Sequence, residues 1–209
     1  MAKRSRWSVG LISCAVLMVC LAWVGQANAA PQDFNQLLRG EYAFTGEAVC
    51  LASTLGFGVN AFGNFAPLNS SGGTAPPGPS SVFSFSIQGI RAFNGDGTGS
   101  VVARSVQVNH TNFGSNASDI SSDFTYEVAP DRTFTVEHGP TTATAVPPAA
   151  GTSTTTGVKF SGRISQDLKT LVMSTEEPTV ETRSFTPPVG PPGVDYRICH
   201  RARTAIKIK

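Results

Sequence analysis

The stretch from Phe93 to Val101 constrains the fold of this chain more than any other, because it fits only a tight turn between two strands. Its three glycines alternate with Asn, Asp and Thr, a composition through which neither a strand nor a helix continues. The residues on both sides, 81–93 and 99–109, are rich in Val, Ile, Phe and Ser. The stretch therefore predicts a β-hairpin and, with it, an all-β fold.

A two-residue alternation of apolar and polar side chains recurs along the chain and predicts eight strands. They cover residues 41–50, 82–93, 99–109, 123–128, 133–138, 158–164, 169–175 and 196–208, and the pattern also allows a short strand at 179–183. Long connections, of which 51–81 is the longest, alternate with tight turns such as Ala129-Pro130-Asp131-Arg132. We therefore predict an eight-stranded antiparallel up-and-down β-barrel with long loops at one end and tight turns at the other.

The first thirty residues predict a secretory signal peptide and no part of the fold. Lys3, Arg4 and Arg6 precede an apolar run at 7–25, and small residues at 26–29 form a cleavage site. An uncleaved membrane anchor is the alternative, since roughly 19 apolar residues can just span a bilayer. With residues 1–30 removed, residues 31–209 form a single domain, which we expect to be periplasmic or extracellular.

Removal of the signal peptide also changes the charge of the chain. The whole chain has 16 basic and 14 acidic side chains; three bases leave, so the mature protein has 13 and 14, a net charge of −1. The basic character of the precursor therefore gives no reason to expect a nucleic-acid partner.

Two cysteines remain after residue 30, Cys50 and Cys199, and an even pair in an exported protein predicts a disulfide. In a closed barrel the first and last strands are neighbours, so the two cysteines can meet. By alternation, however, Cys50 shares the inward face of Tyr42, whereas Cys199 shares a face with arginines that we expect to point outward. We predict a β-bulge at Gly46 that reconciles the two faces.

Three motifs resemble those of exported bacterial proteins with calycin-like and allene-oxide-cyclase-like barrels. They are Leu38-x-Gly40-x-Tyr42-x-Phe44, Phe93-Asn94-Gly95-Asp96-Gly97-Thr98-Gly99 and Phe124-Thr125-Tyr126-Glu127-Val128-Ala129-Pro130-Asp131. The resemblance implies a fold and a compartment and implies no activity.

No residue pattern predicts a catalytic, cofactor or metal site. Asn94, Asp96 and Thr98 match the first half of a calcium loop, but Ser105 stands where the bidentate Glu is needed. His110, His138 and His200 lack metal-ligand spacing. The basic row in the last strand, which includes Arg197, Arg201, Arg203, Lys207 and Lys209, predicts a solvated outer face paired with Glu41 and Glu47; an anionic lipid, polysaccharide or acidic partner is the alternative.

The aromatic side chains assigned to the barrel interior predict the binding of a small apolar ligand, or a packed core without a cavity. These residues are Tyr42, Phe83, Phe85, Tyr126, Phe134, Phe160 and Tyr196. Two alternatives stay open: a small outer-membrane barrel, because long loops and short turns also alternate in that class, and a barrel enzyme by fold analogy.

Overall fold

The computed structural model describes residues 33–74 and 80–209, so the predicted signal peptide lies outside the described part of the chain. From Phe34 onward the chain forms one compact unit. After a short 3-10 helix, η1 (Phe34–Leu37), come thirteen strands within the described residues. They are β1 (Arg39–Ser53), β2 (Phe57–Val59), β3 (Phe65–Pro67), β4 (Ser80–Asn94), β5 (Thr98–Asn109), β6 (Ser115–Val128), β7 (Thr133–His138), β8 (Thr141–Ala145), β9 (Thr152–Thr156), β10 (Lys159–Ile164), β11 (Thr170–Ser174), β12 (Val180–Thr186) and β13 (Gly193–Lys207).

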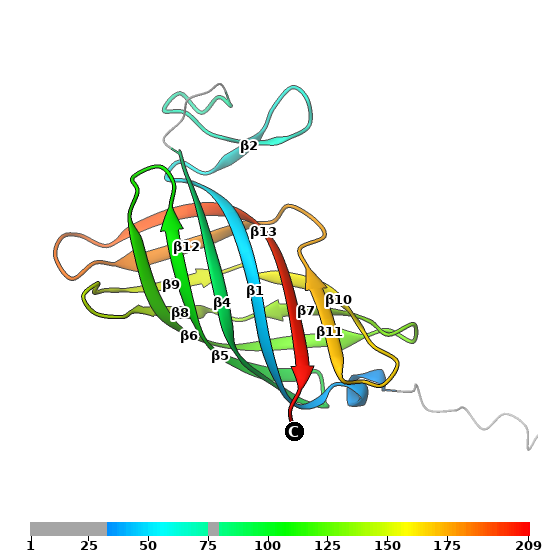
Figure 1. Ribbon diagram of the computed structural model, residues 1–209. Coiled ribbons are helices and arrows are strands. Elements are labelled where there is room, and N and C mark those ends of the chain that lie inside the picture. Colours follow the sequence, from blue (N-terminus) through cyan, green and yellow to red (C-terminus); the bar gives the residue numbers. More distant parts are fainter. Residues whose placement is uncertain (1–32, 75–79) are drawn as a thin grey trace, which may run out of the picture. The chain divides into compact units, whose positions relative to one another are not determined.

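Eight strands close into an antiparallel barrel in the order β1-β4-β5-β6-β7-β10-β11-β13, and β13 pairs back onto β1. Figure 1 shows β1 lying between β4 and β13 at this closure. The predicted fold class is therefore confirmed. Closure leaves no free strand edge in the ring, which removes the unpaired backbone groups that otherwise promote aggregation.

Three strands outside this ring, β8, β9 and β12, form a second closed circuit at the long-loop end of the barrel. They join β6 to β13 through the pairs β6–β8, β8–β9, β9–β12 and β12–β13. Along the chain, β8 follows β7 after two residues, and β10 likewise follows β9. Because β8 and β9 continue the wall next to β7 and β10, the barrel extends further along its axis than the short strands β7, β10 and β11 alone would allow.

The connections at the long-loop end are shorter than the alternation predicts, because strands extend into segments that lack an apolar face. The connections left there are residues 110–114, 146–151, 175–179 and 187–192, beside the long connection from β1 to β4. The optional strand at 179–183 is present as β12. The two hairpins predicted around 94–98 and 129–132 are confirmed by the β4–β5 and β6–β7 pairings.

The tight-turn end of the barrel is filled by packed apolar side chains. Phe93 contacts the rings of Tyr42, Phe124 and Tyr126, with centroids 5.1–5.4 Å apart. The Tyr126 hydroxyl donates to the carbonyl oxygen of Leu38 at 2.7 Å and accepts the Gly95 N–H at 2.9 Å. These bonds fix η1 and the first hairpin against the core, so this end is closed.

The predicted β-bulge at Gly46 is wrong. The β1–β13 register runs without interruption from Tyr42, opposite Lys207, to Ser53, opposite Tyr196, and places Cys50 opposite Cys199. The disulfide predicted between these cysteines is present. Because Cys50 is buried on the inner face, Cys199 is buried there too, and every second residue of β13 around it points into the barrel.

Candidate functional site

The inner face of β13 carries arginines, which is the reverse of the sequence-based assignment. Arg201 and Arg203 are 2% and 7% exposed, whereas Ile206 on the opposite face is 58% exposed. Their direction follows from the uninterrupted register with β1. In β5 the alternation sets Val102, Val106 and Val108 on one face against Ser105 and Gln107 and so favours an inward Val102, but Val101 is buried and Val102 is exposed.

Six of the seven aromatic residues assigned to the interior are on the inner face. Tyr42, Phe83, Tyr126, Phe134 and Phe160 are buried, and Phe85 is partly buried against the core. Tyr196 is an exception: it alternates with the buried Asp195, lies on the outer face, and has its ring beside Gly56. Whether any of these rings contacts a ligand remains a prediction.

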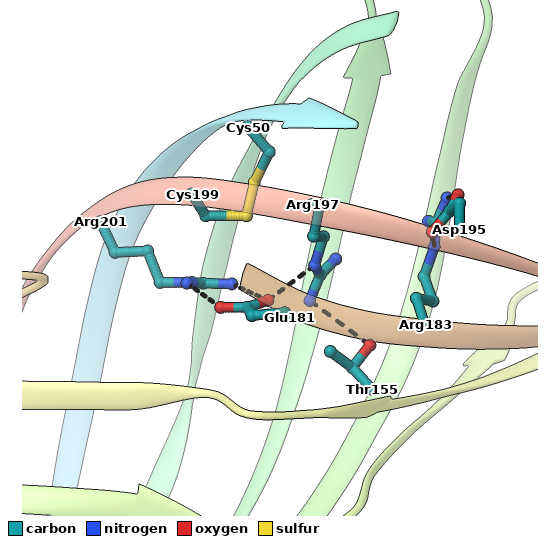
Figure 2. Close-up of a disulfide and its surroundings, with 8 residues drawn as sticks. All are labelled: Cys50, Thr155, Glu181, Arg183, Asp195, Arg197, Cys199 and Arg201. Carbon is teal, nitrogen blue, oxygen red and sulfur yellow. Dashed lines mark hydrogen bonds and ion pairs between the residues drawn. A yellow bond between two sulfur atoms is a disulfide. The ribbon is translucent and has the colours of Figure 1, made fainter. Parts of the chain in front are cut away.

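A buried ionic cluster joins the neighbouring strands β12 and β13 on the inner face. One oxygen of Glu181, which is 1% exposed, accepts hydrogen bonds from Arg197 Nε and Arg201 Nη2, both at 2.7 Å. Arg201 Nη1 pairs with the other oxygen of Glu181, and Arg197 reaches Thr155 Oγ1 at 3.4 Å. Figure 2 shows this cluster beside the disulfide, with Arg183 and Asp195 paired further along the same two strands.

Two more arginines lie deeper in the barrel and form no ion pair with any residue of the described chain. Arg203 lies over the Phe160 ring, 4.5 Å from its centroid. Arg91, which is fully buried, lies between 5.2 and 5.4 Å from the centroids of Phe44, Phe124 and Phe160. Stacking on aromatic rings stabilises the planar face of a guanidinium but leaves its N–H groups without acceptors.

His138 is the partner of Arg91. Arg91 Nη2 lies 3.1 Å from His138 Nε2, and His138 Nδ1 lies 3.3 Å from Ser122 Oγ. Since a guanidinium only donates, Nε2 must accept and the ring proton of a neutral imidazole is on Nδ1. Burial, with the charges of Arg91, Arg203 and Arg201 adding to it, lowers the pKa of His138 to about 2. The imidazole is therefore neutral at ordinary pH.

Burial and neighbouring charges also shift the pKa values of other charged groups in the interior. Burial lowers the pKa of Arg91 to about 10 and lowers that of Arg203, next to Arg91 and Arg201, well below its usual value. Burial alone would raise the pKa of Glu181, but the adjacent Arg197 and Arg201 outweigh it and lower that pKa. Glu181 is thus an anion held between two cations.

Two hollows lie inside the barrel. The outer one is a pocket of about 280 Å³ at the long-loop end, here called the mouth pocket, and its lining includes Asn116, Ala145, Ser153, Arg183 and Asp195. The inner one is a cavity of about 50 Å³, here called the inner cavity. Its lining side chains are Phe85, Ile87, Val101, Ile120, His138, Thr141, Val158, Phe160, Arg197, Arg201 and Arg203.

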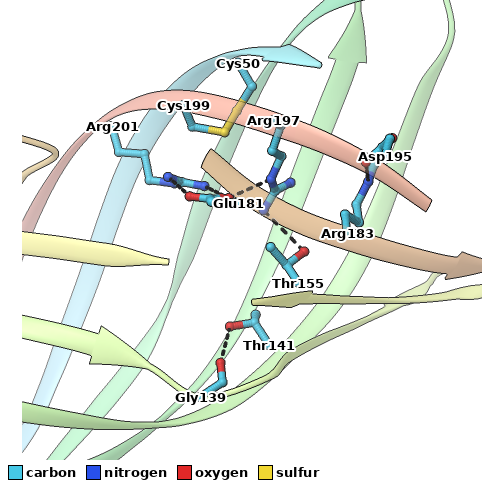
Figure 3. A network of polar contacts seen from close by, with 10 residues as sticks. All are labelled: Cys50, Gly139, Thr141, Thr155, Glu181, Arg183, Asp195, Arg197, Cys199 and Arg201. Carbon is cyan, nitrogen blue, oxygen red and sulfur yellow. Dashed lines mark hydrogen bonds and ion pairs between the residues drawn. A yellow bond between two sulfur atoms is a disulfide. The ribbon is translucent and has the colours of Figure 1, made fainter. Parts of the chain in front are cut away.

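The two hollows follow one another along the barrel. On β8, Thr141 lines the inner cavity and Ala143 lines the mouth pocket; on β13 the corresponding residues are Arg197 and Asp195. Residues two apart on a strand are roughly 7 Å apart. Figure 3 shows Glu181, Arg197 and Thr155 together with Thr141, which donates to the Gly139 carbonyl oxygen at 3.4 Å. The two hollows therefore adjoin along β8 and β13, with Arg197 lining the inner one and Asp195 the outer one.

Sequence reasoning missed Arg91, Glu181 and the inward direction of Arg201 and Arg203. One signal was available: Cys199 and the two arginines occupy alternate positions of one strand. A regular pairing of Cys50 with Cys199 would have placed all three on the inner face with Tyr42. The hydrophobic character of the isoleucines on the other face of β13 favoured the opposite choice.

An open groove of about 720 Å³ lies over β5, β6 and β7 and includes Asp123 and Glu137 in its lining. Among the described residues no group of three or more His, Cys, Asp or Glu side chains is placed to hold a metal ion. The stretch after Asn94 forms a turn instead, in which Asp96 accepts from the backbone and hydroxyl of Thr98. The buried charges make the interior the candidate site.

Comparison of the chain with protein-family models, curated proteins and solved structures gave no match. The fold and site define the class by themselves: a closed eight-stranded antiparallel barrel, consistent with a calycin-like architecture, with a basic and partly hollow interior. None of the described residues belongs to a helix with the length and apolar character needed to cross a membrane.

Proposed function

We propose that this protein is an exported binding protein that takes a small molecule through the mouth pocket into the barrel. The observation that carries the proposal is the asymmetry of the interior. One end is filled by packed aromatic rings, whereas the other holds a pocket of about 280 Å³ lined by polar and small side chains. Hollows at the mouths of β-barrels are common positions for small ligands.

The disulfide supports an exported location for the protein. Cys50 and Cys199 are joined, and such a bond fits the oxidising environment of an exported protein. Periplasmic or extracellular delivery remains part of the proposal, because the segment that would direct it lies outside the described residues.

A purely apolar ligand fits this interior less well than the sequence suggested. Phe85, Ile87, Val101 and Ile120 offer apolar contacts, but buried guanidinium groups face the same space. An apolar ligand would leave the Arg203 charge without a partner, at considerable cost in free energy. The ligand we propose therefore has a polar group as well as an apolar part.

Blocking the mouth tests this function. The probe is the amphipathic dye anilinonaphthalene sulfonate, and its binding is followed by fluorescence. The protein is expressed as the full chain, recovered after export and kept free of detergent. Ala145→Trp places a large ring in the mouth pocket, whereas Thr144→Trp places the same ring on the exposed outer face of β8. We expect saturable binding to the wild type and to Thr144→Trp, and loss of binding in Ala145→Trp. Equal binding by both variants, or no saturable binding to the wild type, would contradict the proposal.

The outer-membrane alternative keeps one specific observation in its favour. Val102, Ile90, Ala43 and Ile206 are register neighbours across four strands, and three of these side chains are exposed. The outer face also carries exposed charges, including Arg104, Asp119, Glu137 and Lys159, and lipid-facing charges at the bilayer midplane are costly. Precipitation of the exported protein in the absence of detergent would favour the membrane reading over a water-soluble carrier.

A further inference from the structure

We infer that the inner cavity is a carboxylate-binding subsite: it receives the singly charged head group of a ligand whose adjacent carbons are apolar. This inference rests on the proposed function, because the head group reaches the inner cavity through the mouth pocket. It adds the chemical class of the ligand.

The first support is the balance of charge inside the barrel. Five arginines have side chains on the inner face, Arg91, Arg183, Arg197, Arg201 and Arg203. Two carboxylates, Glu181 and Asp195, face them there. His138 contributes no charge, so these seven side chains together have three positive charges in excess. Buried charges without partners are strongly disfavoured, and a bound anion reduces that excess.

The second support is a set of hydrogen-bond donors without acceptors. The Nε–H groups of Arg91, Arg201 and Arg203, and Nη1 of Arg91, are buried and have no hydrogen-bond partner in the described chain. A guanidinium has no acceptor atom, so only an oxygen or an anion can satisfy these donors. Arg201 and Arg203 both line the inner cavity. Their unpaired donors and the cavity therefore belong to one site.

The third support is the shape and lining of the inner cavity. A volume of about 50 Å³ exceeds what one water molecule needs and is small for an organic ligand. Apart from the arginines, His138 and Thr141, its lining side chains are apolar. A carboxylate places two oxygens, which matches the two unpaired Nε–H groups of the lining residues Arg201 and Arg203, and leaves its first carbons against Ile87, Val101 and Val158. A phosphate or sulfate has three or four oxygens to satisfy. Two oxygens on a paired set of guanidinium donors is a favourable, charge-assisted arrangement.

The geometry also relates the ionic cluster to the cavity. Glu181 holds Arg197 and Arg201, which both line the inner cavity. A carboxylate that enters competes with Glu181 for Arg201 and gains the unpaired Arg203. Glu181 thereby acts as the resident anion that the ligand partly replaces.

Calorimetric titration with two probes of equal tail length tests the inference. Hexanoate and hexanamide have the same tail and head groups of similar size, one a carboxylate anion and the other a neutral amide, so no variant is needed for the comparison. We expect hexanoate to bind wild-type protein at least about tenfold more tightly than hexanamide, since hydrogen bonds to a charged group contribute more than neutral ones. Equal affinities, or no saturable binding of hexanoate at millimolar concentration, would overturn the inference.

Variants then locate the site. Arg203→Met keeps an unbranched side chain that ends about where Arg Nε lies and removes the charged guanidinium, and we expect it to weaken hexanoate binding by about tenfold or more. Arg203→Lys restores part of the affinity because it restores the charge. The matched control is Arg104→Met, on the exposed outer face, which leaves the affinity unchanged. Folding of each variant is checked by circular dichroism, and a folded Arg203→Met variant with wild-type affinity would contradict the site.

Inorganic phosphate and chloride serve as competitors that report on the head group. Displacement of hexanoate by either salt at concentrations well below those that screen surface charge would assign the subsite to inorganic anions and overturn the carboxylate class. If hexanoate fails to bind while anilinonaphthalene sulfonate binds and Ala145→Trp abolishes that binding, the inference is wrong and the proposed function stands. If Ala145→Trp changes the binding of neither hexanoate nor anilinonaphthalene sulfonate, the proposed function is wrong as well.

Discussion

Gly46 lies directly opposite Arg203 in the β1–β13 ladder, and a methyl group on Gly46 would be 2.4 Å from the Arg203 Cγ atom. The glycine gives the arginine the space to turn into the barrel. Its missing side chain therefore serves the interior directly and has no connection with a bulge.

We predict that Gly46→Ala destabilises the protein by about 1–3 kcal/mol, the usual cost of overpacking a close-packed interior. The added methyl group would also lie 2.5 Å from the backbone oxygen of Ala202, which cannot move without shifting the strand. Urea denaturation of the exported protein measures the change. Thr45→Ala, on the exposed outer face one residue away, is the control and should change the free energy of unfolding very little. Equal stability of Gly46→Ala and the wild type would mean that Arg203 takes another path.

Glu181→Gln should be among the most damaging single substitutions in the barrel. It removes the only carboxylate within ion-pair distance of Arg197 and Arg201 in the described chain. Breaking one side of a buried ion pair typically costs about 3–5 kcal/mol, because the remaining charge stays buried. Thermal unfolding is measured in parallel for Asp119→Asn, which breaks the exposed pair with Arg104. The difference between the two variants shows how much of the loss of stability comes from burial of the ion pair and how much from loss of any ion pair. A similar melting temperature for the two variants would show that water reaches the Glu181 cluster.

The alternation of apolar and polar residues predicted the strands correctly where the inward side chains are apolar. It did not predict the strands whose inward side chains are polar or small. Around 124–138 the inward residues are Phe, Tyr and Val, with His138 at the end of the row, so the pattern and the structure agree. In β8 and β9 the inward residues are mostly Thr, Ala and Ser, and no periodicity marks them as strands. These strands surround the mouth pocket, so the same polarity that hides them from sequence reasoning suits them to a binding site.

The faces of β5 and β13 were misassigned for a related reason. β-branched residues suit a strand on either face, so outward Val102 and Ile206 resembled core residues. The inward positions of β13 hold Arg201 and Arg203, which the rule of apolar interiors excludes. Only contacts between strands distant in sequence, such as those of Arg203 with Phe44 and Phe160, show how these charges are accommodated.

The disulfide should resist reductant until the barrel unfolds. Cys50 and Cys199 are 1% and 2% exposed and lie on the inner face. We expect alkylation after treatment with dithiothreitol to be slow in buffer and fast in urea, measured as a mass increase. The Cys50→Ala, Cys199→Ala double variant releases a loop with a sequence separation of 149 and should be less stable by about 2–5 kcal/mol. Rapid alkylation under native conditions would show that the ladder between β1 and β13 opens locally.

Acidification should destabilise the protein through His138. Its pKa is about 2 in the folded barrel, where burial and the charges of Arg91, Arg203 and Arg201 oppose protonation, and about 6.5 in the unfolded chain. Between these values the unfolded state binds the proton and the folded state does not, so stability falls as pH falls below about 6.5. The lowered pKa of Glu181 acts in the same direction at lower pH, because its ion pairs are lost when it is protonated.

The prediction is a loss of about 2 kcal/mol from this histidine between pH 7 and pH 5, at 1.4 kcal/mol per pH unit below its unfolded pKa. His138→Gln keeps an acceptor for Arg91 and cannot be protonated, so it should remove that part of the pH dependence. The exposed His110→Gln is the control, since His110 contacts only Ser84 through its ring nitrogen on the surface. Urea midpoints at the two pH values measure the effect. An unchanged pH dependence in His138→Gln would mean that His138 accepts a proton inside the barrel, which would require an anion beside Arg91 and Arg203 that offsets their charge.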